Sequence, residues 1–308
     1  MRILFITSSR LGEAVISCGI LEALRTQYPK ARITVACGAS CAGLFSRLPR
    51  LERVITVGKG TSRDFHRLRV WSKLFGRFWD IAVDTRGSSL LYFLAAGQRI
   101  VIHARHGLPL YQQFATALRL SPPPLPVVWV NASDMTEAKR RLPAEAPLIG
   151  LGPTASSTRR IWPPERFVET YRAIAEILPG SRPVVFTGVS DAERLAGMEI
   201  QARLPGAQLL PATLPASLLA ACMARMRLYI GNDTGLLQLA AAAQAPVVGL
   251  FGRDRVAEFA PAAPHAAAVV APAGSHEGAM ALLGVDAVLA AAVPLLGCNE
   301  KPSNMRVF

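Results

Sequence analysis

The sequence predicts an α/β protein of two domains, each with a parallel β-sheet covered by helices. The chain has 308 residues, which is enough for two domains of ~100–200 residues each. Hydrophobic residues make up 51% and charged residues 18%, a composition that can fill two cores and excludes a disordered protein. Short β-branched runs alternate with helical stretches along nearly the whole chain, and this alternation is typical of parallel sheets.

The first half begins with a strand and a helix whose apolar side chains share one face, namely Val15, Ile16, Ile20, Leu21 and Leu24. In order, the expected elements are strand 2–7, helix 12–28, strands 32–37 and 53–57, a basic helix at 63–77, and strands 80–84 and 99–103. The densest proline cluster of the chain follows at 121–126. We therefore expect an N-terminal domain at 1–145, a Pro-rich connector at about 121–147 and a C-terminal domain at 146–308.

The second half repeats the pattern. Strands are expected at 148–151, 183–187, 207–210, 228–230 and 246–250, with helices at 164–178, 191–203, 214–224 and 235–243. Two Rossmann-like halves would place a ligand cleft between them. Ligands of such sheets bind beyond the carboxyl ends of the strands, so functional residues are expected in the strand-to-helix turns.

Positive charge is concentrated in the first half. Residues 1–150 hold 21 Lys/Arg and 9 Asp/Glu, a net charge of +12, whereas residues 151–308 have a net charge of +1. This asymmetry predicts an anionic partner for the first half. Lys59, Arg63 and Arg67 are the candidate contacts, although a solvated helix face explains them as well. Nucleic acid is disfavoured because aromatic residues do not alternate with the basic ones and no nucleic-acid motif occurs.

Five cysteines without a C-x-x-C pair indicate a reducing compartment and no zinc site. The N-terminal apolar run is too short for a signal peptide. The most apolar window, 278–297, contains Asp286 and Pro294, so a buried helix is favoured over a membrane span. These features predict a cytoplasmic protein, with peripheral contact to a membrane surface as an option.

The turn after the first strand, residues 8–15, places Gly12 and Glu13 at the start of a helix. A carboxylate at this position would point into the expected cleft. It would equally complement the helix dipole, and the sequence leaves both interpretations open. No G-x-G-x-x-G motif is present in the turn, which disfavours a dinucleotide site in this half.

Two turns of the second half are suited to a phosphate or diphosphate. Residues 231–240 end a strand in a polar turn and begin a helix with small residues, whose N–H groups can bind an anion. Residues 153–163 join hydroxyls and guanidiniums, which can grip a pyrophosphate through charge-assisted hydrogen bonds. An ordinary helix N-cap and a solvated basic loop are the simpler alternatives.

The three turns occur in the order strand–LGE–helix, P-x-x-S-x-x-x-R-x-W-P and D-T-G-x-x-x-x-A-A-A followed by P-V-V-G-L-F-G. This order resembles glycosyltransferase family 9, the ADP-heptose:lipopolysaccharide heptosyltransferases and their relatives, and the block 231–252 is its most specific part. The resemblance implies a GT-B fold of two facing Rossmann-like domains. It also implies an inverting, metal-independent enzyme at the cytoplasmic face of the inner membrane, with no cofactor other than the ADP-sugar co-substrate.

The resemblance also assigns roles to individual residues. Glu13 stands at the position of the catalytic base, which is usually aspartate. Lys59, Arg63 and Arg67 are the acceptor candidates on the ground of their charge alone. The implied donor-binding residues are Ser156, Arg160, Thr187, Gly188, Leu214, Asp233, Thr234, Gly235, Leu236 and Gln238. Gln238 replaces the usual histidine and cannot carry a proton or positive charge near neutral pH. No metal ligands are implied.

The expected function is transfer of a sugar, with heptose favoured, from an ADP-sugar to a lipopolysaccharide-core or related glycan. Such an acceptor is lipid-linked and anionic, which suits the positive charge of the first half. Two alternatives stay open. Glu13 and Gln238 would fit a catalytically weakened relative that serves as a binding or assembly subunit. A nucleotide-sugar epimerase of GT-B shape would need a further set of acid–base residues.

Overall fold

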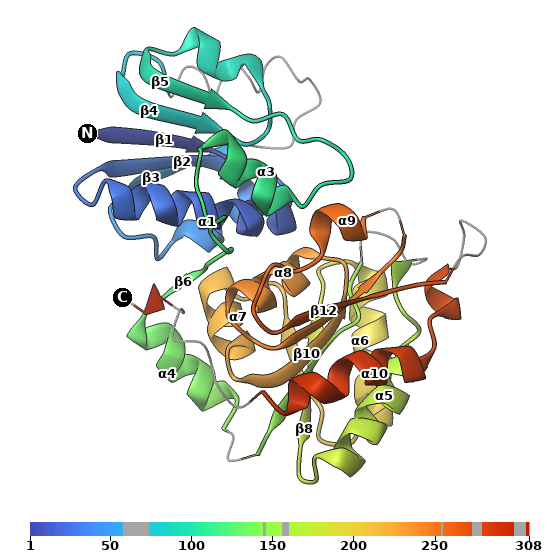
Figure 1. Ribbon diagram of the computed structural model, residues 1–308. Coiled ribbons are helices and arrows are strands. Elements are labelled where there is room, and N and C mark those ends of the chain that lie inside the picture. The colour runs from blue at the N-terminus through green and yellow to red at the C-terminus, as the bar shows by residue number, and fades with distance from the viewer. Residues whose placement is uncertain are drawn as a thin grey trace. The chain divides into compact units, whose positions relative to one another are not determined.

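The computed structural model describes residues 1–57, 74–143, 146–155, 160–253, 255–272, 279–298 and the backbone of 306–307. The chain divides into two compact units, Met1–Trp129 and Val130–Val307. Each unit contains one parallel sheet with helices packed on it, so the predicted α/β class is confirmed (Figure 1).

Unit 1 has a five-stranded sheet in the order β3-β2-β1-β4-β5, with all neighbours parallel. Its elements are β1 (Arg2–Ile6), α1 (Leu11–Gln27), β2 (Arg32–Gly38), the 3-10 helix η1 (Ala39–Phe45), β3 (Leu51–Val57), β4 (Trp79–Asp84), the 3-10 helix η2 (Ser89–Phe93), β5 (Ala96–Val101) and α3 (Leu110–Ala117). The central strand β1 is apolar throughout its buried length because both of its faces are covered. The basic helix expected at 63–77 lies mostly outside the described residues.

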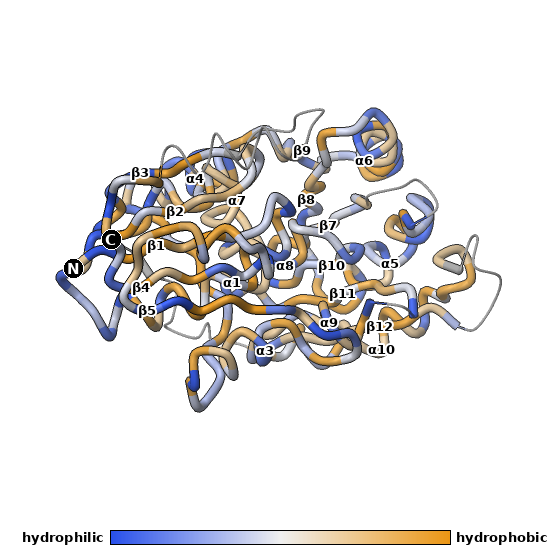
Figure 2. The backbone as a smooth tube through the Cα atoms, turned by 90° about the horizontal axis from the view of Figure 1, so that it is seen from above, coloured by the Kyte–Doolittle hydropathy of each residue, from blue (hydrophilic) through white to orange (hydrophobic). Residues whose placement is uncertain are grey.

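Unit 2 has a six-stranded sheet in the order β12-β11-β10-β7-β8-β9. Its elements are α4 (Ala132–Arg141), β7 (Leu148–Gly152), α5 (Pro164–Ile177), β8 (Arg182–Thr187), α6 (Asp191–Arg203), β9 (Gln208–Pro211), α7 (Ala216–Met223), β10 (Met226–Asn232), α8 (Gly235–Ala242), β11 (Val247–Phe251), α9 (Val256–Phe259), β12 (Ala266–Val270), the 3-10 helix η4 (Ala279–Leu282) and α10 (Val285–Leu296). α5, α6 and α10 cover one face and α7 and α8 the other. Figure 2 shows β11 as hydrophobic, as burial on both faces requires.

The core of unit 2 is anchored by Trp162, which is fully buried. Its ring meets Phe167 edge-on at a centroid distance of 4.9 Å, and its indole nitrogen donates to the carbonyl of Leu283 at 3.0 Å. These contacts fix the segment that precedes α5 against the segment that precedes α10. The loop before α5, where the sequence predicts phosphate-binding residues, therefore starts from a rigid base.

The helix expected in the apolar window 278–297 is α10, and it is buried on one face only. Val288, Ala292 and Leu296 pack into the core, whereas Val293 is exposed. In the described parts of the chain, none of the helices is both long and apolar enough to cross a membrane.

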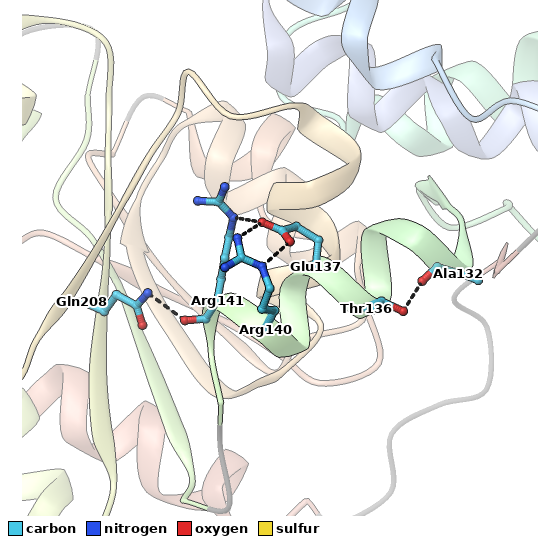
Figure 3. Close-up of polar contacts among 6 residues, drawn as sticks. All are labelled: Ala132, Thr136, Glu137, Arg140, Arg141 and Gln208. Carbon is cyan, nitrogen blue, oxygen red and sulfur yellow. Dashed lines mark hydrogen bonds and ion pairs between the residues drawn. The ribbon is translucent and has the colours of Figure 1, made fainter.

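The first unit ends at Trp129, within the Pro-rich connector expected at about 121–147. The segment in between forms α4, which packs on α7 of unit 2. Gln208 of β9 donates to the carbonyl of Arg141 at 2.8 Å, which ties the end of α4 to the sheet of unit 2 (Figure 3). Arg140 and Arg141 both bind Glu137, and the hydrogen bond from Arg140 is the largest cause that lowers the pKa of Glu137 to about 2.

Close to this boundary, β6 (Trp129–Val130) pairs with β13 (Arg306–Val307), so the two ends of the unit 2 segment meet in a two-stranded ladder. All five cysteines are free thiols, and four of them are buried. Burial raises the pKa of Cys37 to about 12 and that of Cys222 to about 11, so these thiols stay protonated and act as small apolar side chains.

Candidate active site

The turn between β10 and α8 carries the D-T-G sequence. β10 extends into the turn because the amide of Asp233 donates to the carbonyl of Leu250 at 3.0 Å. Thr234 is the N-cap residue of α8, with extended backbone angles and no side-chain capping bond. Its hydroxyl instead pairs with that of Thr154, 3.0 Å away at the end of β7. The first amides of α8, including Gly235 and Leu236, are therefore not capped by a side chain and can bind an anion.

Asp233 is paired with one arginine and lies near the charge of a second. Its carboxylate forms an ion pair with Arg255 at 3.0 Å, and the Arg255 guanidinium stacks over the ring of Phe259 at 4.1 Å. Burial raises the pKa of the Asp233 carboxyl, and the positive charges of Arg255 and Arg160 offset this only in part. The turn thus combines one half-buried carboxylate with two nearby guanidiniums.

Asn232 connects this turn to the loop that carries Arg160. Its side chain is buried, its amide donates to the carbonyl of Arg160 at 2.8 Å, and its oxygen accepts from the amide of Trp162 at 3.4 Å. Two turns that are far apart in sequence are therefore fixed side by side at the carboxyl ends of β7 and β10. Ser156, predicted to bind in the same loop, lies outside the described residues.

Asn232→Ala is expected to lower the free energy of unfolding by ~1–3 kcal/mol, because two backbone groups lose their partner in a buried setting. Urea denaturation measures the change. Gln208→Ala is a matched control, since it removes an amide–carbonyl bond of the same 2.8 Å length at an exposed position. Water can replace that bond, so the control should lose much less. Equal losses for both variants would contradict the structural role of Asn232.

Thr187, Gly188 and Leu214 lie at the carboxyl ends of β8 and β9, beside β7 on the same edge of the sheet. Thr187 is buried, and its carbonyl accepts from the amide of Ala212 at 2.8 Å. A Cβ on Gly188 would stand 2.1 Å from the Glu193 carboxylate, which bonds back to Ser190 at the start of α6. The structure thus brings these residues onto the edge that holds Asp233 and Arg160.

Gln238 is placed differently from the other predicted residues. Its side chain is 2% exposed, and its amide donates to the carbonyl of Phe259 at 2.7 Å. The amide therefore ties α8 to the end of α9, and through it to the ring over which Arg255 stacks.

Asp233→Asn should raise the melting temperature at neutral pH. The raised pKa means that folding favours the neutral carboxyl, whose contribution to stability is present below the ordinary value of 3.8 and is lost as the pH rises through the folded-state pKa. The asparagine stays neutral, so its advantage should shrink as the pH falls toward 3.8. Thermal unfolding across this pH range measures it. The exposed Asp286→Asn should bring no gain at neutral pH, and a gain for Asp233→Asn that does not depend on pH would contradict the argument.

In unit 1, Glu13 lies in the first turn of α1, at the carboxyl end of β1. Its carboxylate accepts from the Ser8 hydroxyl at 2.6 Å and from the Arg10 guanidinium at 3.1 Å, and its side chain is 25% exposed. The turn sits close against β2, since a Cβ on Gly38 would stand 2.5 Å from the Cα of Ser9. Glu13 is therefore oriented by two donors while it stays accessible to a ligand.

The turn after β4 lies beside that of Glu13, and the sequence analysis did not single it out. Asp84 is fully buried and accepts from the amide of Arg86 at 2.7 Å and from the Ser88 hydroxyl. Thr85 donates to Thr7 at 3.3 Å, which joins the two turns directly. This arrangement presents the exposed Arg86 on the edge that carries Glu13. Lys59, Arg63 and Arg67, predicted to bind the acceptor, lie outside the described residues.

Residues 109–280, more than half of the chain, match the family model described as Glycosyltransferase family 9 (heptosyltransferase). The chain belongs to glycosyltransferase family 9.

Curated relatives agree with this assignment. The chain is 27% identical to "Lipopolysaccharide heptosyltransferase 2" of Salmonella typhimurium LT2, with 88% of each chain covered, and 27% identical to the protein of that name from Escherichia coli K12, with the same coverage. Among solved structures it is similar to a family 9 glycosyltransferase from Veillonella parvula, with a TM-score of 0.79, 17% identity and coverage of 96% and 97%. E. coli ADP-heptose lps heptosyltransferase II superposes with a TM-score of 0.73, 21% identity and coverage of 96% and 98%.

The whole-chain similarity confirms the predicted GT-B fold class, and the relatives' names confirm that this family 9 chain is a glycosyltransferase. Arg255, Asn232 and Asp84 make contacts in the turns of the candidate site and were not predicted from the sequence. A polar residue at the last position of a buried strand was the available signal for Asn232 and Asp84. Arg255 had no such signal, because its contact with Asp233 spans two turns. In the described parts of the chain, no three His, Cys, Asp or Glu residues gather to form a possible metal site.

Proposed function

We propose that this family 9 enzyme transfers a sugar, with heptose favoured, from an ADP-sugar to a lipopolysaccharide-core or related glycan. The turn that contains Asp233 is the main observation behind the proposal. In this turn, amides of α8 that no side chain caps lie near the guanidiniums of Arg255 and Arg160. Two curated relatives are named lipopolysaccharide heptosyltransferases, and one similar structure is titled as holding ADP, which supports ADP as the nucleotide.

In the proposed inverting reaction, Glu13 accepts the proton of an acceptor hydroxyl, whose oxygen attacks the anomeric carbon. The bond from that carbon to the diphosphate breaks, and the electron pair leaves with the diphosphate. Arg160, Arg255 and the amides of Gly235 and Leu236 stabilise the negative charge that develops on the leaving group. These groups supply the stabilisation within the protein, so we propose a metal-independent step without a cofactor.

We further propose that Asp233, Thr234 and Ser156 shape the diphosphate site, while Thr187, Gly188 and Leu214 line the nucleoside. Gln238 contacts the donor only indirectly, because its amide already bonds the carbonyl of Phe259. Lys59, Arg63 and Arg67 bind the anionic acceptor, and the chain acts as a cytoplasmic enzyme in peripheral contact with the inner membrane.

Incubation of the purified protein with a panel of nucleotide-sugars tests the function. We expect slow hydrolysis of an ADP-sugar, with ADP-heptose ahead of ADP-hexoses, and little hydrolysis of UDP- or GDP-sugars. Binding of ADP-heptose without hydrolysis or transfer would favour the alternative of a weakened relative that acts as a binding subunit. The side-chain amide of Gln238 already donates to the carbonyl of Phe259, so it does not take the place of the family's histidine at the donor, and this favours testing the alternative. Absence of binding to every nucleotide-sugar would contradict both.

A further inference from the structure

Among the residues that the structure describes, exposed aromatic side chains gather in one short part of unit 1. Among the described residues, the exposed Phe, Tyr and Trp side chains are Phe75, Phe78, Tyr92 and Phe93, which are 58–67% exposed. We call these four residues the aromatic patch. Large rings scattered singly on a surface need no explanation, but a concentration of this kind in a stretch of one unit marks an interaction surface.

The four rings belong to one region because each is adjacent in sequence to a residue of the same core cluster. Phe75 follows Leu74, Phe78 precedes Trp79, and the η2 residues Tyr92 and Phe93 lie between Leu91 and Leu94. Leu74, Trp79, Leu91 and Leu94 are 0–3% exposed and pack together against the sheet. The segment before β4 and the 3-10 helix η2 therefore cover the same core while their aromatic residues face outward.

The support beneath the patch is firm and positively charged. Arg99 of the edge strand β5 donates to the carbonyl of Leu91 at 3.1 Å and to that of Leu94 at 2.7 Å, which fastens η2 to the sheet. Arg77, between Phe75 and Phe78, binds Glu52 of β3 at 2.9 Å. The rings therefore project from a fixed base that contains the guanidiniums of Arg77 and Arg99.

The charge of unit 1 determines which partner fits. Residues 1–129 hold 18 Lys/Arg and 6 Asp/Glu, a net charge of +12, whereas the rest of the chain is close to neutral. In the sequence, residues 58–73 directly before the patch hold five Lys/Arg and one Asp. Aromatic rings beside excess positive charge match the interface of an anionic bilayer, where rings sit at the headgroup level and cations near the surface are attracted to the negative charge.

We propose that the aromatic patch is the surface through which this protein inserts into an anionic lipid bilayer. This rests on the proposed function, which includes peripheral contact with a membrane, and it places that contact at the amino ends of β4 and β5. The turns that carry Glu13 and Arg86 lie at the opposite, carboxyl edge of the same sheet. The enzyme's unit 1 would thus bind lipid with one end of its sheet and leave the edge with Glu13 free of that contact.

Flotation with vesicles of equal parts phosphatidylethanolamine and phosphatidylglycerol tests the proposal. Phe78→Ser/Tyr92→Ser should weaken vesicle binding by about tenfold or more, because two rings lose their place in the interface. Leu195→Ser/Met198→Ser is the matched control: it removes two apolar side chains of α6 that are 65% and 56% exposed, and it should bind like the unmodified chain. Vesicles of phosphatidylcholine alone should bind weakly, since they offer no negative charge.

Unchanged vesicle binding by Phe78→Ser/Tyr92→Ser would overturn the proposal. So would light scattering that shows a dimer dissociated by this variant, because the patch would then contact a second copy of the chain. Nucleotide-sugar hydrolysis in solution should be equal for the variant and the unmodified chain. Loss of lipid binding with intact hydrolysis supports the patch independently, and failure of hydrolysis in both proteins would count against the proposed function alone.

Discussion

Glu13→Gln should lower the turnover number by ~10²–10⁴-fold, the range for removal of a general base. The substitution keeps the size of the side chain and takes away its proton-accepting capacity. The Glu13 carboxylate accepts from Ser8 at 2.6 Å and from Arg10 at 3.1 Å, so both of its oxygens are oriented by the turn. Because Glu13 lies in unit 1 and the Asp233 turn, where we propose that the diphosphate binds, lies in unit 2, the dissociation constant for the ADP-sugar should stay near that of the unmodified enzyme.

The matched variant is Glu13→Asp. It restores the residue that the family usually carries and should retain much more activity, although its carboxylate reaches ~1 Å less far. Transfer assays with saturating donor and acceptor measure both variants. If Glu13 only complements the dipole of α1, Glu13→Gln should instead leave turnover unchanged and cost ~0.3–1 kcal/mol of stability. A variant that transfers sugar at full rate and melts slightly earlier would end the catalytic assignment.

Much of the fold could be predicted because the spacing of apolar residues along the sequence indicates most of its helices and strands. β1 and β10 are short apolar runs, and helices such as α5 begin at Pro-Pro and present one apolar face. α4 shows where this approach stops. Its sequence is mostly polar, and its assignment to unit 2 depends on contacts with α7 and on the bond from Gln208 to Arg141. No local pattern contains that information, so the sequence left α4 inside the expected connector at about 121–147.

Some residues of the candidate site could likewise be predicted from the sequence, and others could not. Glu13 and Asp233 stand in the turns that join predicted strands to the following helices, so the rule for parallel sheets finds them. Arg255 is brought to Asp233 by the turn after β11, and Arg160 is fixed through Asn232, which belongs to another turn. Such contacts depend on strand order, in which β10 lies between β7 and β11. The sequence order of the strands does not specify it.

Arg160→Ala should weaken binding of the ADP-sugar by about 10–150-fold, which corresponds to the ~1.5–3 kcal/mol of a hydrogen bond to a charged group. The Arg160 side chain is exposed, and its backbone carbonyl accepts a hydrogen bond from Asn232. Among the described residues, no carboxylate forms an ion pair with the Arg160 guanidinium, so this group can bind the diphosphate. Isothermal titration with ADP and with the ADP-sugar measures the loss. Arg194→Ala, at an exposed ion pair on α6, is the control that should bind normally.

Arg255→Ala should have a smaller effect on the same dissociation constant, because the guanidinium of Arg255 is already engaged by Asp233 at 3.0 Å and by the ring of Phe259. The two arginines share Asp233 as a neighbour, so their effects should not add in the double variant. If Arg160→Ala binds donor normally while Arg255→Ala does not, the diphosphate lies on the turn after β11. If both variants bind the donor normally, the diphosphate does not bind at the start of α8.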